Sequence, residues 1–376
     1  MHTAPARWDI FCAVVDNYGD IGVTWRLARQ LVAEHGQQVR LWVDEPSALA
    51  HLWPAAAPKA AQQALAGVDV WRWDAQAEQA EPPDVVIEAF ACELPAAYIA
   101  RMAAQPRPPL WLNLEYLSAE GWVEGCHGLP SPQAGLKKHF FFPGFTAKTG
   151  GLLREQGLMA AQAGFDRRAF LQTLNVPLAQ LEQALLVSLF AYADAPLASL
   201  LAAWQVDSAP VIALLPAGRL VPLAAQALGV KQLAVGDVLT RGALTLVVLP
   251  FLPQDDYDQL LWSCDLNFVR GEDSFVRAQW AAAPLLWHIY RQADDAHLDK
   301  LNAFLERYVS GLAAEQAALV RQVQLAWNQQ TDMRQLWTEL RNSLPVLQKH
   351  HAAWRAGLMA QEDVALKLMH FYATWL

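Results

Sequence analysis

Short apolar segments alternate with helical segments in two series that together extend from Trp8 to His288. The first series opens with a strand expected at residues 8–15, a polar loop, a helix at 23–35 and a strand at 39–43. This order makes one β-α-β unit in which the two strands pair in parallel. The alternation as a whole predicts a doubly wound α/β architecture.

The remaining elements follow the same rhythm and end in a helical block. The first series continues with strands at 68–73, 84–89 and 110–114 and a helix at 96–105. The second series has strands expected at 184–191, 210–215, 244–249, 265–269 and 284–288, with helices at 197–204, 222–228, 255–264 and 274–281. Apolar spacing of three and four predicts helices at 312–327, 333–347 and 364–376. We expect Pro345 to interrupt the second of these, because proline breaks a helix interior.

The length of 376 residues predicts two domains, because a single hydrophobic core stops growing at about 250 to 300 residues. A hydrophobic content of 54% is enough to build both cores. We expect an N-terminal Rossmann-like domain at 1–160 and a second Rossmann-like domain at 161–355. The last segment, 356–376, is a helix that can pack back on the first domain.

The net charge of −9 disfavours nucleic acid as a partner, because phosphate backbones require clustered Lys and Arg. The charge leaves a cationic protein partner open, and it also serves solubility alone. The longest apolar runs fall well short of the roughly 20 residues that cross a bilayer, so we expect no membrane association. The four cysteines are widely spaced and no secretion signal is visible at the N-terminus, which favours a cytoplasmic location.

The loop after the first expected strand carries two carboxylates, Asp16 and Asp20. Ligands of parallel sheets bind at the carboxyl ends of the strands, so this loop is a candidate site. Acidic side chains here would repel a pyrophosphate, which disfavours a dehydrogenase. The two aspartates can face a cation or act as a general base, or one of them can cap the following helix. The other candidate residues of the loop are Asn17, Tyr18 and Gly19.

A second candidate loop lies between the strand expected at 265–269 and the helix expected at 274–281. The free N–H groups and positive dipole at a helix start suit a diphosphate, and an arginine adds charge-assisted hydrogen bonds. The alternative is an ordinary helix cap with solvated acids. The residues of this loop are Arg270, Gly271, Glu272, Asp273 and Ser274.

A third candidate segment follows the strand expected at 244–249. Its aromatic side chain can stack on a nucleobase and its glutamine can hydrogen-bond the base, although such aromatics are also common in cores. The segment consists of Phe251, Leu252, Pro253 and Gln254, and Phe190 and Tyr192 from another strand end can wall the same cavity. We expect no metal site, because no D-x-D motif follows a strand and no histidine cluster has ligand spacing.

The opening at residues 8–11, the loop at 16–22 and the segment at 270–279 resemble the EarP family, the protein-arginine rhamnosyltransferases of bacterial elongation factor P. The resemblance covers essentially the whole chain. It implies a GT-B fold of two facing Rossmann-like domains, with dTDP-β-L-rhamnose held mainly by the second. It also implies an inverting transfer of rhamnose to an arginine of elongation factor P, a modification that supports translation of proline-rich stretches.

The resemblance also implies roles for the candidate residues. Asp20 is the expected base or guanidinium-orienting group, Asp16 a supporting carboxylate, and Glu272 a third catalytic group. Phe251 and Gln254 would meet the base of the donor. Phe190 and Tyr192 would line the nucleotide site, and Glu272, Asp273 and Ser274 would contact ribose, sugar and diphosphate.

Three other functions remain compatible with the residues themselves. The chain can be a GT-B enzyme with a lipid or small-molecule acceptor, an epimerase of similar architecture, or a non-catalytic protein that binds a nucleotide sugar. A non-catalytic protein leaves the paired Asp16 and Asp20 without an obvious use.

Overall fold

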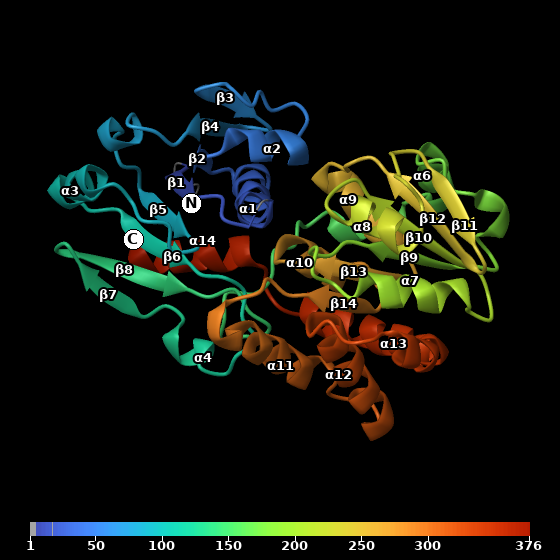
Figure 1. Ribbon diagram of the computed structural model, residues 1–376. Helices are drawn as coiled ribbons and strands as arrows, with labels where there is room; N and C mark the ends of the chain where they lie inside the picture. Colours follow the sequence, from blue (N-terminus) through green and yellow to red (C-terminus); the bar gives the residue numbers. More distant parts are fainter. Residues whose placement is uncertain (1–4, 17) are drawn as a thin grey trace. The chain divides into compact units, whose positions relative to one another are not determined.

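The computed structural model describes residues 5–16 and 18–376 (Figure 1). The chain forms two compact units: the first comprises Met1–Leu158 and Leu358–Leu376, and the second comprises Met159–Gly357. Within the described residues, every helix is too short or too polar to cross a lipid bilayer.

The first unit is built on an eight-stranded sheet. Its strands are β1 (Arg7–Cys12), β2 (Gln38–Val43), β3 (Gln62–Leu65), β4 (Val68–Arg72), β5 (Val85–Ala89), β6 (Leu110–Leu114), β7 (Pro130–Gln133) and β8 (Leu136–Phe141). The order across the sheet is β3-β4-β2-β1-β5-β6-β8-β7. The pairs β3–β4 and β7–β8 are antiparallel hairpins at the two edges, and the strands between them pair in parallel. The carboxyl ends of β1, β5 and β6 therefore meet at one edge of the sheet.

Helices of the first unit include α1 (Gly19–His35), α2 (Pro46–Leu52), α3 (Ala96–Ala104) and α4 (Val123–Cys126). Helix α1 begins four residues earlier than expected, so the glycines at 19 and 22 lie inside the helix and not in a loop. The physical reason is that the Asp20 carboxylate in the first turn binds backbone N–H groups of the preceding loop and closes it tightly. The loop predicted at residues 16–22 is thus shorter than expected.

The end of the chain returns to the first unit as α14 (Val364–Trp375), the red helix of Figure 1. Asp363 caps α14 by accepting a hydrogen bond from the backbone N–H of Leu366 at 3.1 Å. The same carboxylate accepts a bond from the Gln30 amide of α1 at 3.1 Å. A ring contact of 5.7 Å between Trp8 and Tyr372 joins α14 to the start of β1.

The second unit contains a six-stranded sheet. Its strands are β9 (Leu185–Leu189), β10 (Val211–Pro216), β11 (Val238–Arg241), β12 (Leu244–Leu249), β13 (Leu266–Arg270) and β14 (Leu285–His288). The order is β11-β12-β10-β9-β13-β14, and only the edge strand β11 is antiparallel to its neighbour. A core cluster that includes Leu186, Leu214 and Leu249 covers one face of this sheet.

Helices of the second unit connect and cover the strands. They are α6 (Arg167–Thr173), α7 (Leu197–Gln205), α8 (Leu220–Ala227), α9 (Gln254–Ser263), α10 (Asp273–Trp280), α11 (Ala296–Tyr308) and α12 (Ala314–Asn328). Two further helices, α5 (Leu158–Ala163) and α13 (Arg334–Met359), carry the chain across the boundaries of the units.

The strands and helices expected in the two series are present with small shifts at their ends. Strands β3, β7, β8 and β11 and helices α2, α4 and α6 were not expected. The expected interruption at Pro345 is wrong, because α13 continues through this residue. Proline removes one backbone N–H, but Leu340, Leu344 and Leu347 are buried on both sides of it. Burial of these leucines offsets the lost hydrogen bond and keeps the helix continuous.

Candidate active site

Asp20 is a buried carboxylate just beyond the carboxyl end of β1, with only 2% of its surface exposed. Its Oδ2 atom accepts hydrogen bonds from the backbone N–H groups of Val15 at 2.8 Å and Asp16 at 2.9 Å. Its Oδ1 atom accepts the hydroxyl of Tyr116 at 3.1 Å. Burial raises the pKa of Asp20, and the three hydrogen bonds partly oppose this rise. A carboxylate with a raised pKa is a better proton acceptor than an exposed one.

Tyr116 belongs to this site although the candidate loops did not include it. It lies two residues beyond β6, and its ring stacks on Phe90, just beyond β5, with centroids 4.4 Å apart. Phe90 has a φ of 57° and its backbone N–H donates to Leu114 at 2.7 Å. The rule that ligands bind after the strands of a parallel sheet points to Tyr116. Nothing local in the sequence pairs this tyrosine with Asp20.

The other residues of the first loop lie close to Asp20. Asp16 is half-buried, and its carbonyl oxygen accepts the backbone N–H of Gly19 at 2.7 Å. A Cβ atom at Gly19 would lie 3.1 Å from the Asp16 carboxylate, so a side chain here would crowd it. Tyr18 is the N-cap residue of α1, and its ring meets the ring of His51 at 5.5 Å. Asn17 lies outside the described residues.

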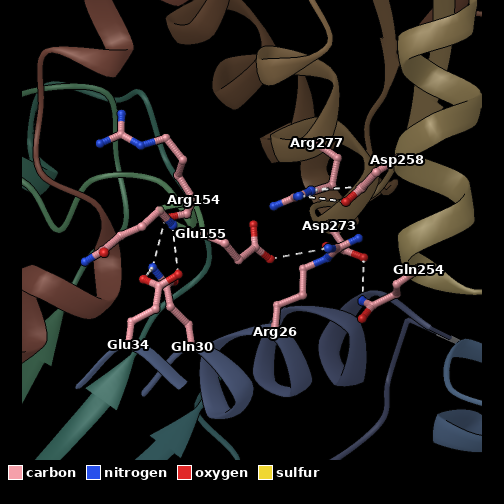
Figure 2. A network of polar contacts seen from close by, with 10 residues as sticks. Arg26, Gln30, Glu34, Arg154, Glu155, Gln254, Asp258, Asp273 and Arg277 are labelled. Atoms are coloured by element: carbon pink, nitrogen blue, oxygen red, sulfur yellow. Dashed lines mark hydrogen bonds and ion pairs between the residues drawn. The ribbon is translucent and has the colours of Figure 1, made fainter. Parts of the chain in front are cut away.

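A polar network that includes residues 154–156 holds helix α1 (Figure 2). Arg26 is buried and lies 3.5 Å from the Glu155 carboxylate. The Gln30 amide donates to the carbonyl of Arg154 at 2.9 Å. Glu34 accepts the backbone N–H of residue 156 at 2.8 Å. These contacts hold the helix that carries Asp20.

In the second unit, Arg270 contacts the rings of the two predicted aromatic residues, Phe190 and Tyr192. Its guanidinium carbon lies 4.3 Å from the ring centroid of Phe190 and 4.9 Å from that of Tyr192. The guanidinium also donates to the carbonyl of Ala191 at 3.4 Å. These residues meet because β9 and β13 are neighbours in the sheet. Contacts between the cation and the rings orient the arginine at the carboxyl edge of the sheet.

The predicted diphosphate loop runs from the end of β13 into α10. The Ser274 hydroxyl accepts the backbone N–H of Arg270 at 3.0 Å and donates to the carbonyl of the same residue. This hydroxyl therefore closes the turn. Gly271 has a φ of 59°, a conformation that glycine adopts without strain. Glu272 is the N-cap residue of α10 and is half-buried.

The predicted base-contacting segment leads into α9. Gln254 is 2% exposed, and its amide donates to the Asp273 carboxylate at 2.9 Å. Figure 2 shows this pair on the starts of α9 and α10. Phe251 is half-buried and Pro253 is the N-cap residue of α9. Leu252 is buried and packs in the hydrophobic core cluster of the second unit.

One turn further along, α9 and α10 are joined by a buried ion pair, also drawn in Figure 2. Arg277 donates to the Asp258 carboxylate from Nε at 2.9 Å and from Nη2 at 2.6 Å. Both side chains are almost fully buried. This bidentate pair fixes the relative position of the two helices that present Gln254 and Asp273.

Tyr257 is a further residue that the sequence reasoning missed. Its ring lies 5.5 Å from that of Phe190. Burial raises the pKa of its phenol, and the groups that act on it include Ser274, Arg270 and Asp273. Tyr257 lies three residues after Gln254 in α9, which places both on one face of the helix. That spacing is the signal by which it could have been found.

The structure thus brings the predicted residues together in two groups. One group, in the first unit, has Asp20 at its centre, with Asp16, Tyr18 and Gly19 beside it. The other group, in the second unit, collects at the carboxyl ends of β9, β12 and β13. Its members are Phe190, Tyr192, Phe251, Gln254, Arg270, Gly271, Glu272, Asp273 and Ser274.

Comparison with known proteins agrees with this architecture. Residues 8–373 match the family model described as elongation factor P (EF-P) rhamnosyltransferase EarP. A protein-arginine rhamnosyltransferase of Pseudomonas putida is 59% identical, with 98% of each chain covered. The enzyme of the same name from Pseudomonas aeruginosa is 53% identical, with 99% of this chain and 100% of that chain covered.

Solved structures are similar along the whole chain. The structure that explains EarP-mediated arginine glycosylation of translation elongation factor EF-P is 45% identical, with a TM-score of 0.71 and 99% of this chain and 100% of that chain covered. MurG of Acinetobacter baumannii, at 16% identity and a TM-score of 0.51, covers 98% of this chain and 99% of that chain and supports the fold alone. The fold is the GT-B glycosyltransferase fold. The chain therefore belongs to the EarP family of elongation factor P rhamnosyltransferases.

Proposed function

We propose that the chain transfers L-rhamnose from dTDP-β-L-rhamnose to an arginine side chain of elongation factor P, with inversion at the anomeric carbon. Membership of the family supports the general activity, which is the transfer of rhamnose to an arginine of a protein. The observation that carries the mechanism is the buried Asp20 carboxylate, held by two backbone N–H groups and by Tyr116. The likeness to a structure of EarP-mediated EF-P glycosylation supports the acceptor. A translation factor as acceptor places the reaction in the cytoplasm.

Asp20 acts on the acceptor guanidinium in this proposal. Guanidinium has a pKa of about 13.8, so a carboxylate cannot remove its proton before the reaction. Among residues 5–16 and 18–376, Oδ2 of Asp20 accepts two backbone hydrogen bonds, whereas Oδ1 accepts that of Tyr116. Each carboxylate oxygen has two lone pairs, so Oδ1 is the atom with room for another donor. In this proposal the acceptor guanidinium contacts Asp20 at Oδ1.

The proposed reaction is one displacement. The guanidinium nitrogen forms a bond to the anomeric carbon while the bond from that carbon to the dTDP oxygen breaks on the opposite face. The nitrogen becomes more acidic as it gives up electron density, and its proton passes to Oδ1 of Asp20 late in the step. The leaving dTDP keeps the electron pair of the broken bond. Asp16 supports the loop around Asp20 and adds negative charge near the cationic acceptor.

The second unit holds the donor in this proposal. The N–H groups at the start of α10 and the guanidinium of Arg270 meet the diphosphate. Glu272 and Asp273 contact sugar and ribose hydroxyls, and Glu272 assists catalysis from the sugar side. Phe190, Tyr192 and Phe251 form the aromatic walls of the nucleotide site, and Gln254 meets the base. Ser274 contributes its backbone N–H, because its hydroxyl closes the turn.

No metal takes part in the proposed reaction. The helix start and Arg270 supply the positive charge that a cation would otherwise bring to the leaving group. Across residues 5–16 and 18–376, no three His, Cys, Asp or Glu side chains are grouped as they would be to hold a metal ion.

The experiment that tests the function is incubation of the purified protein with elongation factor P and dTDP-β-L-rhamnose. Mass spectrometry should find one deoxyhexose on one arginine of elongation factor P. The configuration of the new bond, read by NMR of the glycopeptide, tests inversion. An unmodified factor together with transfer to a lipid or small molecule would identify a different acceptor. Binding of the donor with no turnover at all would identify a non-catalytic nucleotide-sugar-binding protein.

A further inference from the structure

His288 ends the edge strand β14 beside the proposed donor site and has no role in the mechanism above. It pairs in register with Arg270 of β13. Its ring is almost fully buried, and Nδ1 accepts the backbone N–H of Tyr192 at 3.2 Å. Its carbonyl oxygen accepts the backbone N–H of Gly271 at 3.2 Å. One residue therefore bonds to both loops that surround Arg270.

The hydrogen bond from Tyr192 defines the protonation state of this ring. An Nδ1 atom that accepts a bond carries no proton, so the neutral ring carries its proton on Nε2. Nε2 lies 3.7 Å from a carboxylate oxygen of Asp194, which favours this arrangement. Burial lowers the pKa of His288 to about 4, with Arg270 and His297 acting in the same direction and Asp194 against it. The ring is therefore neutral at physiological pH and can accept the bond.

The strand that carries His288 is itself fixed by two amides from α12. The Gln324 side chain accepts the backbone N–H of Trp287 at 3.0 Å and donates to the carbonyl of Leu285 at 2.9 Å. One helical turn later, Asn328 accepts the backbone N–H of Ile289 at 3.0 Å and donates to the carbonyl of Trp287 at 2.8 Å. These amides satisfy the outer backbone groups of an edge strand in place of another strand. These hydrogen bonds thus fix the strand segment that carries His288.

We propose that His288 is a positioning residue of the donor site, which holds the backbone of Tyr192 and through it the stacked pair of Tyr192 and Arg270. The ring of Tyr192 also meets that of His288 edge-on at 5.4 Å. Loss of the Nδ1 acceptor leaves the Tyr192 N–H without its partner and frees the loop to move. Arg270 then loses one of the two rings that orient it toward the diphosphate. This inference rests on the proposed donor site.

The test compares two variants that differ in the acceptor at the Nδ1 position. In His288→Asn the side-chain oxygen is attached to Cγ, as Nδ1 is, and can still accept the Tyr192 N–H. In His288→Leu no acceptor remains. We expect His288→Leu to weaken dTDP binding about tenfold in titration calorimetry, as the loss of one buried hydrogen bond predicts. His288→Asn should stay within about threefold of wild type, and the KM for elongation factor P should not change in either variant.

The control is His370→Leu, an exposed histidine on α14 in the first unit, which should bind dTDP as wild type does. If His288→Leu binds dTDP like wild type, or if His288→Asn loses as much affinity as His288→Leu, the positioning role is wrong. A wild-type protein that binds no dTDP would instead contradict the proposed function, and this inference with it.

A second measurement does not need a variant without the acceptor to fold. Nitrogen NMR of the imidazole rings, with the His288 signal assigned by its loss in His288→Asn, should show a neutral ring with the proton on Nε2 at pH 7. The signal should shift when dTDP is added, because the bound nucleotide acts on Arg270 and Tyr192. A proton on Nδ1, or a charged ring at this pH, would overturn the proposal.

Discussion

The hydroxyl of Tyr116 donates a hydrogen bond to Oδ1 of Asp20 at 3.1 Å, across 96 residues of sequence. On the other oxygen, the same carboxylate accepts the backbone N–H groups of Val15 and Asp16. Among the described residues, three hydrogen bonds thus hold Asp20 in one orientation, two at Oδ2 and one at Oδ1. This contact, the Arg277–Asp258 ion pair and the Gln324 amide each have consequences that can be measured.

Substitution of Asp20 by Asn should abolish most of the turnover and at the same time stabilise the protein at neutral pH. Loss of a general base costs about 10² to 10⁴ in rate. Asparagine can keep its oxygen toward the N–H groups of Val15 and Asp16, so the loop should stay closed. Assays at saturating donor and acceptor check the rate, and near-normal turnover would refute the catalytic role.

The stability effect of Asp20→Asn follows from the raised pKa of the folded protein. At a pH between the pKa of Asp20 in the unfolded chain and its pKa in the folded protein, the folded protein binds more protons. The stability that the protonated carboxyl contributes is therefore lost as the pH rises through the pKa of the folded protein. Wild type therefore carries a buried charge at pH 7 that the variant lacks. We expect a higher melting temperature for the variant at pH 7 and a smaller difference as the pH falls toward 4.

Substitution of Tyr116 by Phe should shift the acidic limb of the rate profile to higher pH. The tyrosine hydroxyl lowers the pKa of Asp20, so its removal raises this pKa further and leaves less of the ionised base at a given acidic pH. A hydrogen bond to a charged group is worth about 1.5 kcal/mol, which corresponds to roughly a tenfold slower reaction on the acidic limb. Rates measured from pH 5 to 9 check this, and an unchanged limb would exclude coupling between the two residues.

Removal of divalent cations should leave the reaction unaffected. The start of α10 and Arg270 supply the positive charge for the leaving diphosphate in the proposed mechanism. Turnover of the purified protein after dialysis against EDTA should equal that of the untreated protein. Loss of activity that magnesium restores would show that a cation takes part.

Substitution of Arg277 by Met should destabilise the second unit by about 3 kcal/mol, because it leaves the buried Asp258 carboxylate without its ion-pair partner. Replacement of both residues, with Asp258→Leu added, should recover most of this loss, since no buried charge then remains. Urea unfolding curves of the single and the double variant check the pair. Equal stability of the two variants would mean that the stability of α9 and α10 does not depend on the Arg277–Asp258 ion pair.

Substitution of Gln324 by Leu should cost about 2 kcal/mol, because the buried backbone groups of Trp287 and Leu285 lose their partners. Gln322→Leu on the same helix is the matched control. Its side chain is exposed, so the change in stability should stay within about 0.5 kcal/mol. The melting temperatures of the two variants test this prediction. Similar values would show that the backbone groups at the edge of β14 have other hydrogen-bond partners.

The central strands and helices could be predicted because their signals are local. Residues 244–249 are apolar except for Thr245, and the structure has β12 at the same residues. The edge strands β3, β7 and β11 were not predicted. Each has four residues, partly or fully exposed, so it has neither the length nor the apolar alternation that marks a strand. Their pairing with a longer neighbour creates them.

The candidate loops were found by position, since ligands of parallel sheets bind after the strands. Position alone could not tell how each side chain is used. The Ser274 hydroxyl closes its own turn, and Leu252 lies in the core. Neither outcome is encoded in the short motifs that contain these residues.

By itself, the sequence determined the α/β alternation, the two series and the motifs that place the chain in its family, because these depend on neighbouring residues. Only the tertiary structure decided that Tyr116 meets Asp20 and that His288 meets Tyr192. Each pair spans 96 residues, and each forms because the order of strands brings distant strand ends to one edge of a sheet. Local apolar periodicity defines the strands but carries no information about the order in which they pair.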